Sequence, residues 1–147
     1  MKSIFNYSIF LYLVFLGFVS TAQVSRSQLV GKWAFDYSSS LSKMDTKAQF
    51  LYQSMDAVRK SKLEQAYSGR QFVFTSDGSM TQQLADGRAA TGSWRLSADG
   101  LQLELVDVQN KAQSFVIKQS TETTLVLEVV SQGITKMLLS EWHLIKH

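Results

Sequence analysis

Residues 71–105 read QFVFTSDGSMTQQLADGRAATGSWRLSADGLQLEL and carry the clearest structural signal in the chain. Apolar and polar residues alternate within this stretch, which places successive side chains on opposite faces of a β-strand. Three Asp-Gly pairs, at 77–78, 86–87 and 99–100, interrupt the alternation. Because Asp-Gly supplies the positive φ angles that tight hairpins require, the stretch predicts consecutive antiparallel strands joined by short turns.

The same alternation extends in both directions. Residues 114–118, 124–130 and 134–145 predict further strands, and residues 28–37 predict a first strand with Trp33, Phe35 and Tyr37 on one face. Strands linked by short hairpins lie side by side, and closing the set into a barrel leaves no exposed edge. We therefore predict an all-β fold, an eight-stranded antiparallel up-and-down barrel, with a two-sheet sandwich as the alternative.

Residues 41–66 interrupt this pattern between the first two predicted strands. Their apolar residues recur at three- and four-residue spacing, which predicts one long helix or two helices with a break near Lys60. Capping-box patterns begin at Ser42 and Ser61. The apolar stripe either caps one end of the barrel, which we expect, or forms a docking surface for a partner. Its members are Leu41, Met44, Ala48, Leu51, Met55, Val58 and Ala66.

The N-terminal segment, residues 1–22, has the pattern of a cleaved signal peptide. Lys2 precedes an uncharged apolar core at residues 9–19, and the small residues Ser20 and Ala22 flank the expected cleavage point. The apolar core is too short for a comfortable membrane span. We expect a mature domain of residues 23–147, periplasmic or extracellular and without a transmembrane segment. An uncleaved anchor is the alternative.

The composition excludes several kinds of protein. The 147 residues include no cysteine, which rules out disulfides, thiol catalysis and zinc–thiolate sites. The net charge is +3, and the longest basic cluster, residues 59–62, is interpreted as a solvated helix face. Since nucleic-acid binding requires clustered Lys and Arg, we expect no nucleic-acid partner.

Two motifs carry a resemblance to a known family. At Gly31-Lys32-Trp33 the chain resembles the lipocalin family, whose first strand opens with Gly-x-Trp. Residues 92–103, GSWRLSADGLQL, are similar to a segment common in bacterial exported lipocalin-like domains. The resemblance implies a calycin-type, lipocalin-like barrel with an interior cavity and no catalytic machinery.

The chain departs from the family pattern in three respects. The helical stretch replaces the usual long first loop, and the usual C-terminal helix is missing. In typical lipocalins an arginine near the last strand packs over the first tryptophan, but no arginine follows Arg95 here. The resemblance therefore implies that Lys118, Lys136 or Lys146 takes that position.

Few residues indicate catalysis. Glu141 and His143 share one strand face, as a metal or acid–base pair would, but the sequence offers no evident third ligand. We interpret them as a solvent-facing polar pair at a strand end. The chain also has no Gly-x-Ser-x-Gly elbow and no phosphate-binding glycine loop. We expect no enzymatic activity, no cofactor and no metal, with a hydrolase or isomerase at the barrel mouth as the weakest alternative.

Aromatic residues provide the candidate binding site. Those on strand faces expected to point inward either line a pocket for an apolar ligand or fill the barrel as its core. We predict a binding protein for a small hydrophobic ligand held in the barrel. The alternative is a cell-envelope protein-interaction module, an inhibitor or accessory subunit, with a filled barrel. The candidate ligand-binding residues are Trp33, Phe35, Phe72, Phe74, Trp94, Phe115 and Trp142.

Overall fold

A computed structural model describes residues 23–130 and 138–147. Its strands are β1 (Gly31–Phe35), β2 (Gln71–Phe74), β3 (Ser79–Gln83), β4 (Ala89–Leu96), β5 (Gln102–Asp107), β6 (Ala112–Ser120), β7 (Thr124–Val129) and β8 (Glu141–Lys146). Its helices are α1 (Arg26–Leu29), α2 (Tyr37–Ser42), α3 (Thr46–Gln53) and α4 (Ala57–Tyr67).

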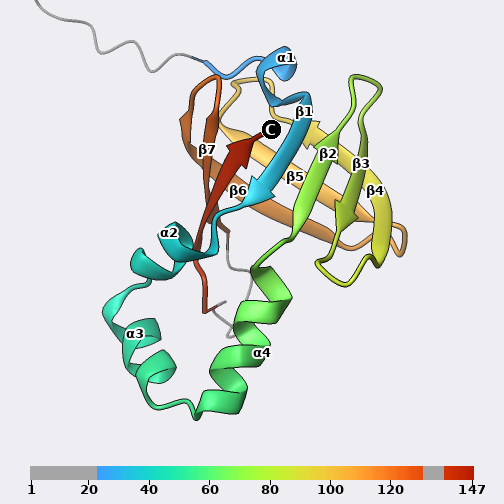
Figure 1. The fold of residues 1–147 in the computed structure, drawn as a ribbon. Coiled ribbons are helices and arrows are strands. Elements are labelled where there is room, and N and C mark those ends of the chain that lie inside the picture. Colours follow the sequence, from blue (N-terminus) through green and yellow to red (C-terminus); the bar gives the residue numbers. More distant parts are fainter. Residues whose placement is uncertain (1–22, 131–137) are drawn as a thin grey trace, which may run out of the picture.

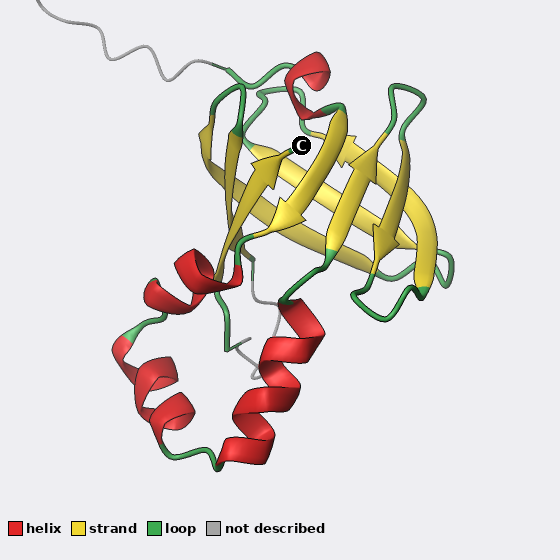
Figure 2. Cartoon of the chain, in the orientation of Figure 1, coloured by secondary structure: helices red, strands yellow, loops and turns green. Residues whose placement is uncertain are grey.

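The strands form one closed barrel (Figure 1). Each strand pairs antiparallel with its neighbours in the chain, and β8 pairs with β1 to close the ring. Helix α1 lies at one end, and α2, α3 and α4 extend from the other (Figure 2). The prediction of an eight-stranded up-and-down barrel with a helical insertion after the first strand is confirmed.

The Asp-Gly pairs form the predicted turns. The glycine of each pair has a positive φ, between 69° and 89°. The aspartate of each pair accepts a hydrogen bond from the backbone N–H two residues later, as Asp77 does from Ser79 at 2.9 Å. Both residues of the pair therefore stabilise the turn, one through its backbone freedom and the other through its carboxylate.

Aromatic side chains fill the middle of the barrel. The Trp142 ring centroid lies 4.9 Å from that of Phe115, 5.5 Å from Phe35 and 6.0 Å from Phe72. Tilted and edge-on contacts at these distances add to the free energy of burial. The interior is thus largely a packed core.

Trp33 and Trp94 both contact residues of helix α1, and the indole N–H of each makes a hydrogen bond. The indole N–H of Trp33 donates to the Leu29 carbonyl at 2.8 Å, and that of Trp94 donates to the Thr75 carbonyl at 3.0 Å. Their exposed fractions are 0% and 1%. Each ring is therefore buried without leaving an unpaired donor.

The first and last strands are shorter than predicted. Helix α1 extends to Leu29, and β1 begins at Gly31, whose φ is 135°, so residues 28–30 are not part of the strand. Asp36 ends β1 by accepting the Ser39 backbone N–H at 3.0 Å, which makes Tyr37 the first residue of a helix. Of the predicted strand at 134–145, β8 contains only the part from Glu141 onward, and residues 131–137 lie outside the described residues.

We call residues 37–67 the helical arm. It contains three helices, not one or two, because the side chains of Asp36, Asp45 and Asp56 each cap a new helix N-terminus. The predicted capping boxes at Ser42 and Ser61 are wrong. Ser42 ends α2, and Ser61 lies inside α4.

The apolar stripe of the arm is divided between buried and exposed positions. Met44 is 6% exposed and Ala48 is 7% exposed, both within the core cluster. Leu51 is 47% exposed and Val58 is 64% exposed, so the prediction that they cap the barrel is wrong. The aspartate-capped breaks redirect the chain. Helix α2 packs against β8, and Tyr67 at the end of α4 contacts the rings of Phe35 and Trp142. The rest of the arm extends away from the barrel (Figure 1).

Two expectations concern export and membranes. The predicted signal peptide, residues 1–22, lies outside the described residues, so its cleavage stays a prediction. Within residues 23–130 and 138–147, no helix has the length and apolarity needed to cross a membrane.

Candidate binding site

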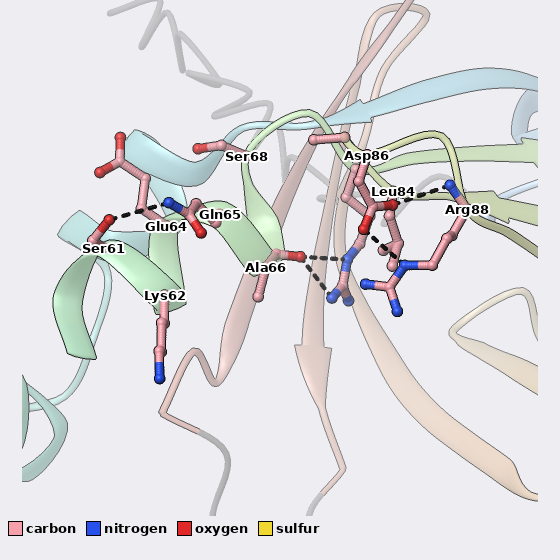
Figure 3. Close-up of a pocket in the computed structure, with 11 residues that line it drawn as sticks. Ser61, Lys62, Glu64, Gln65, Ala66, Ser68, Leu84, Asp86 and Arg88 are labelled. Atoms are coloured by element: carbon pink, nitrogen blue, oxygen red, sulfur yellow. Dashed lines mark hydrogen bonds and ion pairs between the residues drawn. The ribbon is translucent and has the colours of Figure 1, made fainter. Parts of the chain in front are cut away.

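One cavity lies outside the barrel, between α4 and the β3–β4 turn (Figure 3). Its volume is about 800 Å³, and most of its lining is polar or charged. We call it the α4 cleft. None of the predicted aromatic site residues lines it.

A second cavity, which we call the barrel-mouth pocket, does include predicted residues. It has a volume of about 270 Å³ and lies at the barrel end that carries the β5–β6 turn. Strand β1 runs toward the same end before the chain enters the helical arm. The floor of the pocket is apolar, and its rim is polar. The floor consists of Phe72, Met80, Leu105, Phe115 and Trp142, and the rim includes Gln82, Asp107, Lys111 and Gln113.

The seven predicted site residues fall into two groups. Phe72, Phe115 and Trp142 line the barrel-mouth pocket. The other four, Trp33, Phe35, Phe74 and Trp94, line neither cavity, and all seven residues are at most 6% exposed and belong to the core cluster. Contact of either group with a ligand stays a prediction.

Small residues of strand β4 lie beside the barrel-mouth pocket. Gly92 pairs with Met80 on one side and Asp107 on the other, and Ala90 pairs with Gln82. A Cβ atom at Gly92 would lie 2.2 Å from the Val106 carbonyl oxygen, so this position cannot carry a side chain without backbone movement. This wall of the barrel is therefore built from very small residues at the level of the pocket.

The rim of the pocket offers hydrogen-bonding groups. Gln82 is half-buried, and its side-chain amide makes no hydrogen bond to the residues described. Gln113 donates to the Ser114 carbonyl at 3.2 Å, which leaves its amide oxygen available. Asp107 instead holds the β5–β6 turn by accepting the backbone N–H of Lys111 at 2.9 Å. A ligand with an apolar body and one polar group matches this arrangement.

The sequence interpretation missed these rim residues. Gln82 and Gln113 occupy inward positions of an otherwise apolar alternation, and that irregularity is a signal that the sequence does contain. Their common level in the barrel depends on strand register, which the sequence alone does not supply.

The opposite end of the barrel is covered. Helix α1 lies over it, with Leu29 fully buried. Lys146 Nζ lies 5.1 Å from the centroid of the Trp33 ring and donates to the Gln28 carbonyl at 3.1 Å. Lys146, one of the three lysines that the lipocalin resemblance allowed in this position, therefore lies over the first tryptophan, whereas Lys136 lies outside the described residues.

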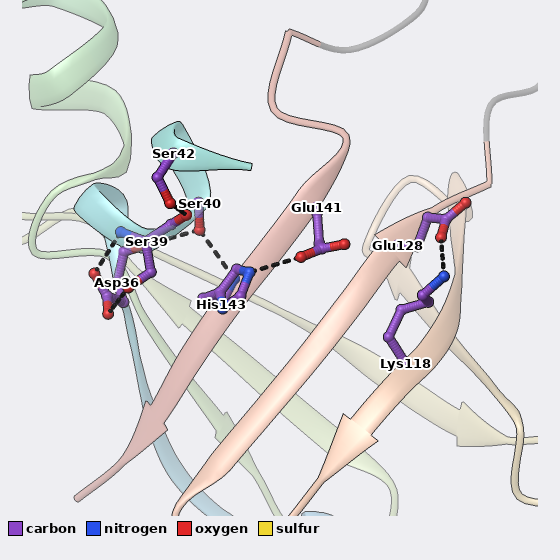
Figure 4. Close-up of polar contacts among 8 residues, drawn as sticks. All are labelled: Asp36, Ser39, Ser40, Ser42, Lys118, Glu128, Glu141 and His143. Atoms are coloured by element: carbon purple, nitrogen blue, oxygen red, sulfur yellow. Dashed lines mark hydrogen bonds and ion pairs between the residues drawn. The ribbon is translucent and has the colours of Figure 1, made fainter. Parts of the chain in front are cut away.

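Glu141 and His143 form a pair, as their spacing predicted (Figure 4). His143 Nε2 lies 2.8 Å from Glu141 Oε1, and both residues are half-buried, so the pair is less exposed than we expected. The backbone N–H of His143 donates to Ser40 Oγ, which in turn donates to the Asp36 carbonyl. These bonds fasten α2 to β8.

The polar contacts around this pair hold backbone segments together. Burial raises the pKa of Asp36, but hydrogen bonds from Ser39 and the nearby charge of His143 outweigh it and leave the pKa below its ordinary value. The Ser40 hydroxyl contacts backbone atoms and not the imidazole ring, so the geometry is not that of a nucleophile and base. In the described part of the chain, no three His, Asp or Glu residues cluster closely enough to hold a metal ion.

No family model matches the chain, and no curated protein sequence matches it. Among solved structures, the chain is similar to the crystal structure of a DUF4847 family protein from Bacteroides vulgatus ATCC 8482. The similarity covers 80% of this chain and 92% of that chain, at 14% sequence identity and a TM-score of 0.46.

Proposed function

We propose that the protein is an exported binding protein that holds a small amphipathic molecule in the barrel-mouth pocket and catalyses no reaction on it. The observation that carries the proposal is the combination of an aromatic floor with the Gln82 amide at the rim, which has no hydrogen-bond partner among the described residues. Apolar pockets with a few convergent polar groups are typical ligand sites.

The volume limits the ligand. Small-molecule sites commonly measure about 300–1,000 Å³, and this pocket is just below that range. The ring contacts of Trp142 occupy the barrel beneath it. The ligand is therefore expected to be a single ring or a short chain with one polar group, smaller than a ligand that fills a whole barrel.

The proposed location and the absence of catalysis rest on the sequence. The signal-peptide pattern of residues 1–22 supports export, and the resemblance to lipocalin-like domains supports a binding role. Intact-mass measurement of the secreted protein tests export, because cleavage after Ala22 leaves a chain that begins at Gln23. A membrane-bound species that retains residues 1–22 would contradict it.

Ligand binding is tested with two neighbouring variants. Gln82→Phe places a ring in the pocket, whereas Gln83→Phe places the same ring on the exposed face of the same strand. We expect benzyl alcohol to cause saturable NMR shifts at Met80 and Leu105 in the parent and in Gln83→Phe. These shifts should disappear in Gln82→Phe. Equal shifts in all three proteins would contradict binding in this pocket.

Native mass spectrometry of protein purified from its own host addresses the natural ligand. A bound mass that is present in the parent and lost in Gln82→Phe supports the proposal. A bound mass that persists in Gln82→Phe places the ligand elsewhere.

The exposed residues of the arm favour a second candidate, a protein-interaction module. Phe50, Leu51 and Val58 are among the large apolar side chains that remain exposed, at 71%, 47% and 64%. Exposed apolar groups of this kind often mark interaction surfaces. A photo-crosslinker at position 50 should then yield one discrete adduct in the native host, and the same group at exposed Gln102 should yield none. Equal labelling at both positions would count against this candidate.

A further inference from the structure

We infer that the α4 cleft binds a small molecule that carries a carboxylate or phosphate group. Arg88 on the β3–β4 turn (Figure 3) and Arg70, which also lines the cleft, would hold that group. The cleft shares no lining residue with the barrel-mouth pocket, so this inference is independent of the proposed function.

Arg70 is a half-buried cation that no carboxylate of the described chain neutralises. Its guanidinium lies 4.5 Å from the centroid of the Tyr67 ring, and its Nε and Nη2 atoms donate to the Ala66 carbonyl at 3.2 Å and 2.8 Å. Burial lowers its pKa, which reflects the cost of removing this charge from water. An anion in the cleft would offset that cost, because buried charges are stable when paired.

Arg88 is positioned on the other wall of the cleft. Its Nε donates to Asp86 Oδ2 at 2.7 Å, and its backbone N–H donates to Asp86 Oδ1 at 3.0 Å. The first bond orients the exposed guanidinium, whose terminal nitrogens have no hydrogen-bond partner among residues 23–130 and 138–147. A guanidinium fork of this kind binds carboxylate or phosphate oxygens with directional hydrogen bonds.

The charge balance of the cleft favours an anion. Lys62 is a third cation and has no hydrogen bond or ion pair within the described part of the chain. The two acidic residues that line the cleft compete only weakly with an anionic ligand for these cations. Asp86 is engaged by Arg88, and Glu64 points away from the Arg88 side of the cleft (Figure 3).

The cleft can also hold the body of a small molecule. Its volume of about 800 Å³ lies within the usual range for ligand sites, about 300–1,000 Å³. Ala66, Leu84 and Ala85 supply apolar contacts beside the charged groups. An aryl or alkyl carboxylate or phosphate monoester therefore matches the lining better than a bare inorganic ion.

Three probes of similar shape distinguish the contribution of ligand charge to binding from that of ligand shape. Benzoate, phenyl phosphate and the uncharged benzamide are titrated into the full domain at constant ionic strength, and backbone amide shifts are recorded by NMR. We expect saturable shifts at residues 65–70 and 84–88 with one or both anions and none with benzamide. A stronger response to phenyl phosphate assigns the site to phosphates, and a stronger response to benzoate assigns it to carboxylates.

Variants then locate the anion. Arg88 is exposed, so Arg88→Gln should leave the fold intact and weaken anion binding about tenfold or more, as expected for a lost charge-assisted hydrogen bond. Arg95→Gln is the matched control, because Arg95 is also exposed and ion-paired but lies on β4 outside the cleft. Arg70→Gln should weaken binding at least as much, with its amide spectrum serving as the check on folding.

Three results would overturn the inference. One is a linear, unsaturable response to both anions, and another is an equal response to benzamide. The third is unchanged anion affinity in Arg88→Gln. None of these results bears on benzyl alcohol binding in the barrel-mouth pocket, so the two proposals fail separately.

Discussion

In the barrel, every strand is hydrogen-bonded to two neighbours, and the inward aromatic side chains are almost completely buried. In the helical arm, α4 contains no buried residue, and α3 contains only Ala48. The barrel is therefore stabilised by non-local burial, whereas the outer arm depends on the local hydrogen bonds of its helices and caps. Regions that depend on local hydrogen bonds unfold locally at a lower free-energy cost than the global unfolding of the domain.

The largest expected difference is in the response to truncation. Trp33→Ala and Trp94→Ala should each cost about 3–5 kcal/mol, because each removes a fully buried ring. In the arm, Phe50→Ala should change the free energy of unfolding by no more than about 0.5 kcal/mol, because Phe50 is exposed. Denaturant midpoints measure both. If the tryptophan variants match the parent, the inward assignment of these strand faces is wrong.

Within the arm, substitutions at buried and at exposed positions should differ in their effect on stability. Met44→Asp should cost about 2–3 kcal/mol, the value of burying a large apolar side chain, because the arm can detach and let the new charge reach water. Leu51→Asp should change stability by less than about 0.5 kcal/mol. Thermal unfolding of the two variants tests this. A large loss in Leu51→Asp would restore the expectation that the stripe caps the barrel.

Removal of a helix cap should act locally. Asp56 Oδ1 accepts the Arg59 backbone N–H at 2.8 Å, and loss of such a cap costs about 1 kcal/mol of helix stability. Because α4 buries no residue, Asp56→Ala should speed hydrogen exchange in α4 while exchange in β2–β8 stays unchanged. Faster exchange throughout the barrel would show that the two regions unfold together.

The smallest expected effect is the pH dependence of the barrel turns. Hydrogen bonds from the Thr75 hydroxyl and the Ser79 backbone hold the pKa of Asp77 below its ordinary value of 3.8. Its contribution to stability is therefore fully present above pH 3.8 and is lost as the pH falls from there through the lowered pKa. Denaturation measured from pH 7 down to below the lowered pKa should show a shallower acid decline for Asp77→Asn than for the parent. Identical pH profiles would mean that the turn carboxylate does not contribute.

The barrel was predictable because its signals are local. An Asp-Gly pair needs no distant partner to form a turn, and alternation places Phe72 and Phe74 on one face whatever they meet there. The limits of β1 were less predictable. Asp36 could equally have continued the strand, and its capping of α2 depends on the backbone that follows.

The arm and the pocket were less accessible for a different reason. Helical spacing identifies an apolar stripe, but whether Leu51 or Val58 is buried depends on the direction that each helix takes after the caps at Asp45 and Asp56. Those caps could have been found, since aspartate is a preferred N-cap residue. The barrel-mouth pocket depends on register, because strand pairing decides which side chains, such as Gln82 and Gln113, lie at the same level of the barrel.

The contact of Lys146 with α1 also bears on the order of folding. Its hydrogen bond to Gln28 joins residues 118 positions apart, and the β1–β8 seam lies beside it. Closing so long a loop is slow, and domains dominated by such contacts typically fold in milliseconds to seconds. A nascent chain cannot complete the barrel until β8 has left the ribosome. With no proline among the 147 residues, the slow phase typical of prolyl isomerisation is absent, and ring closure is expected to set the folding rate.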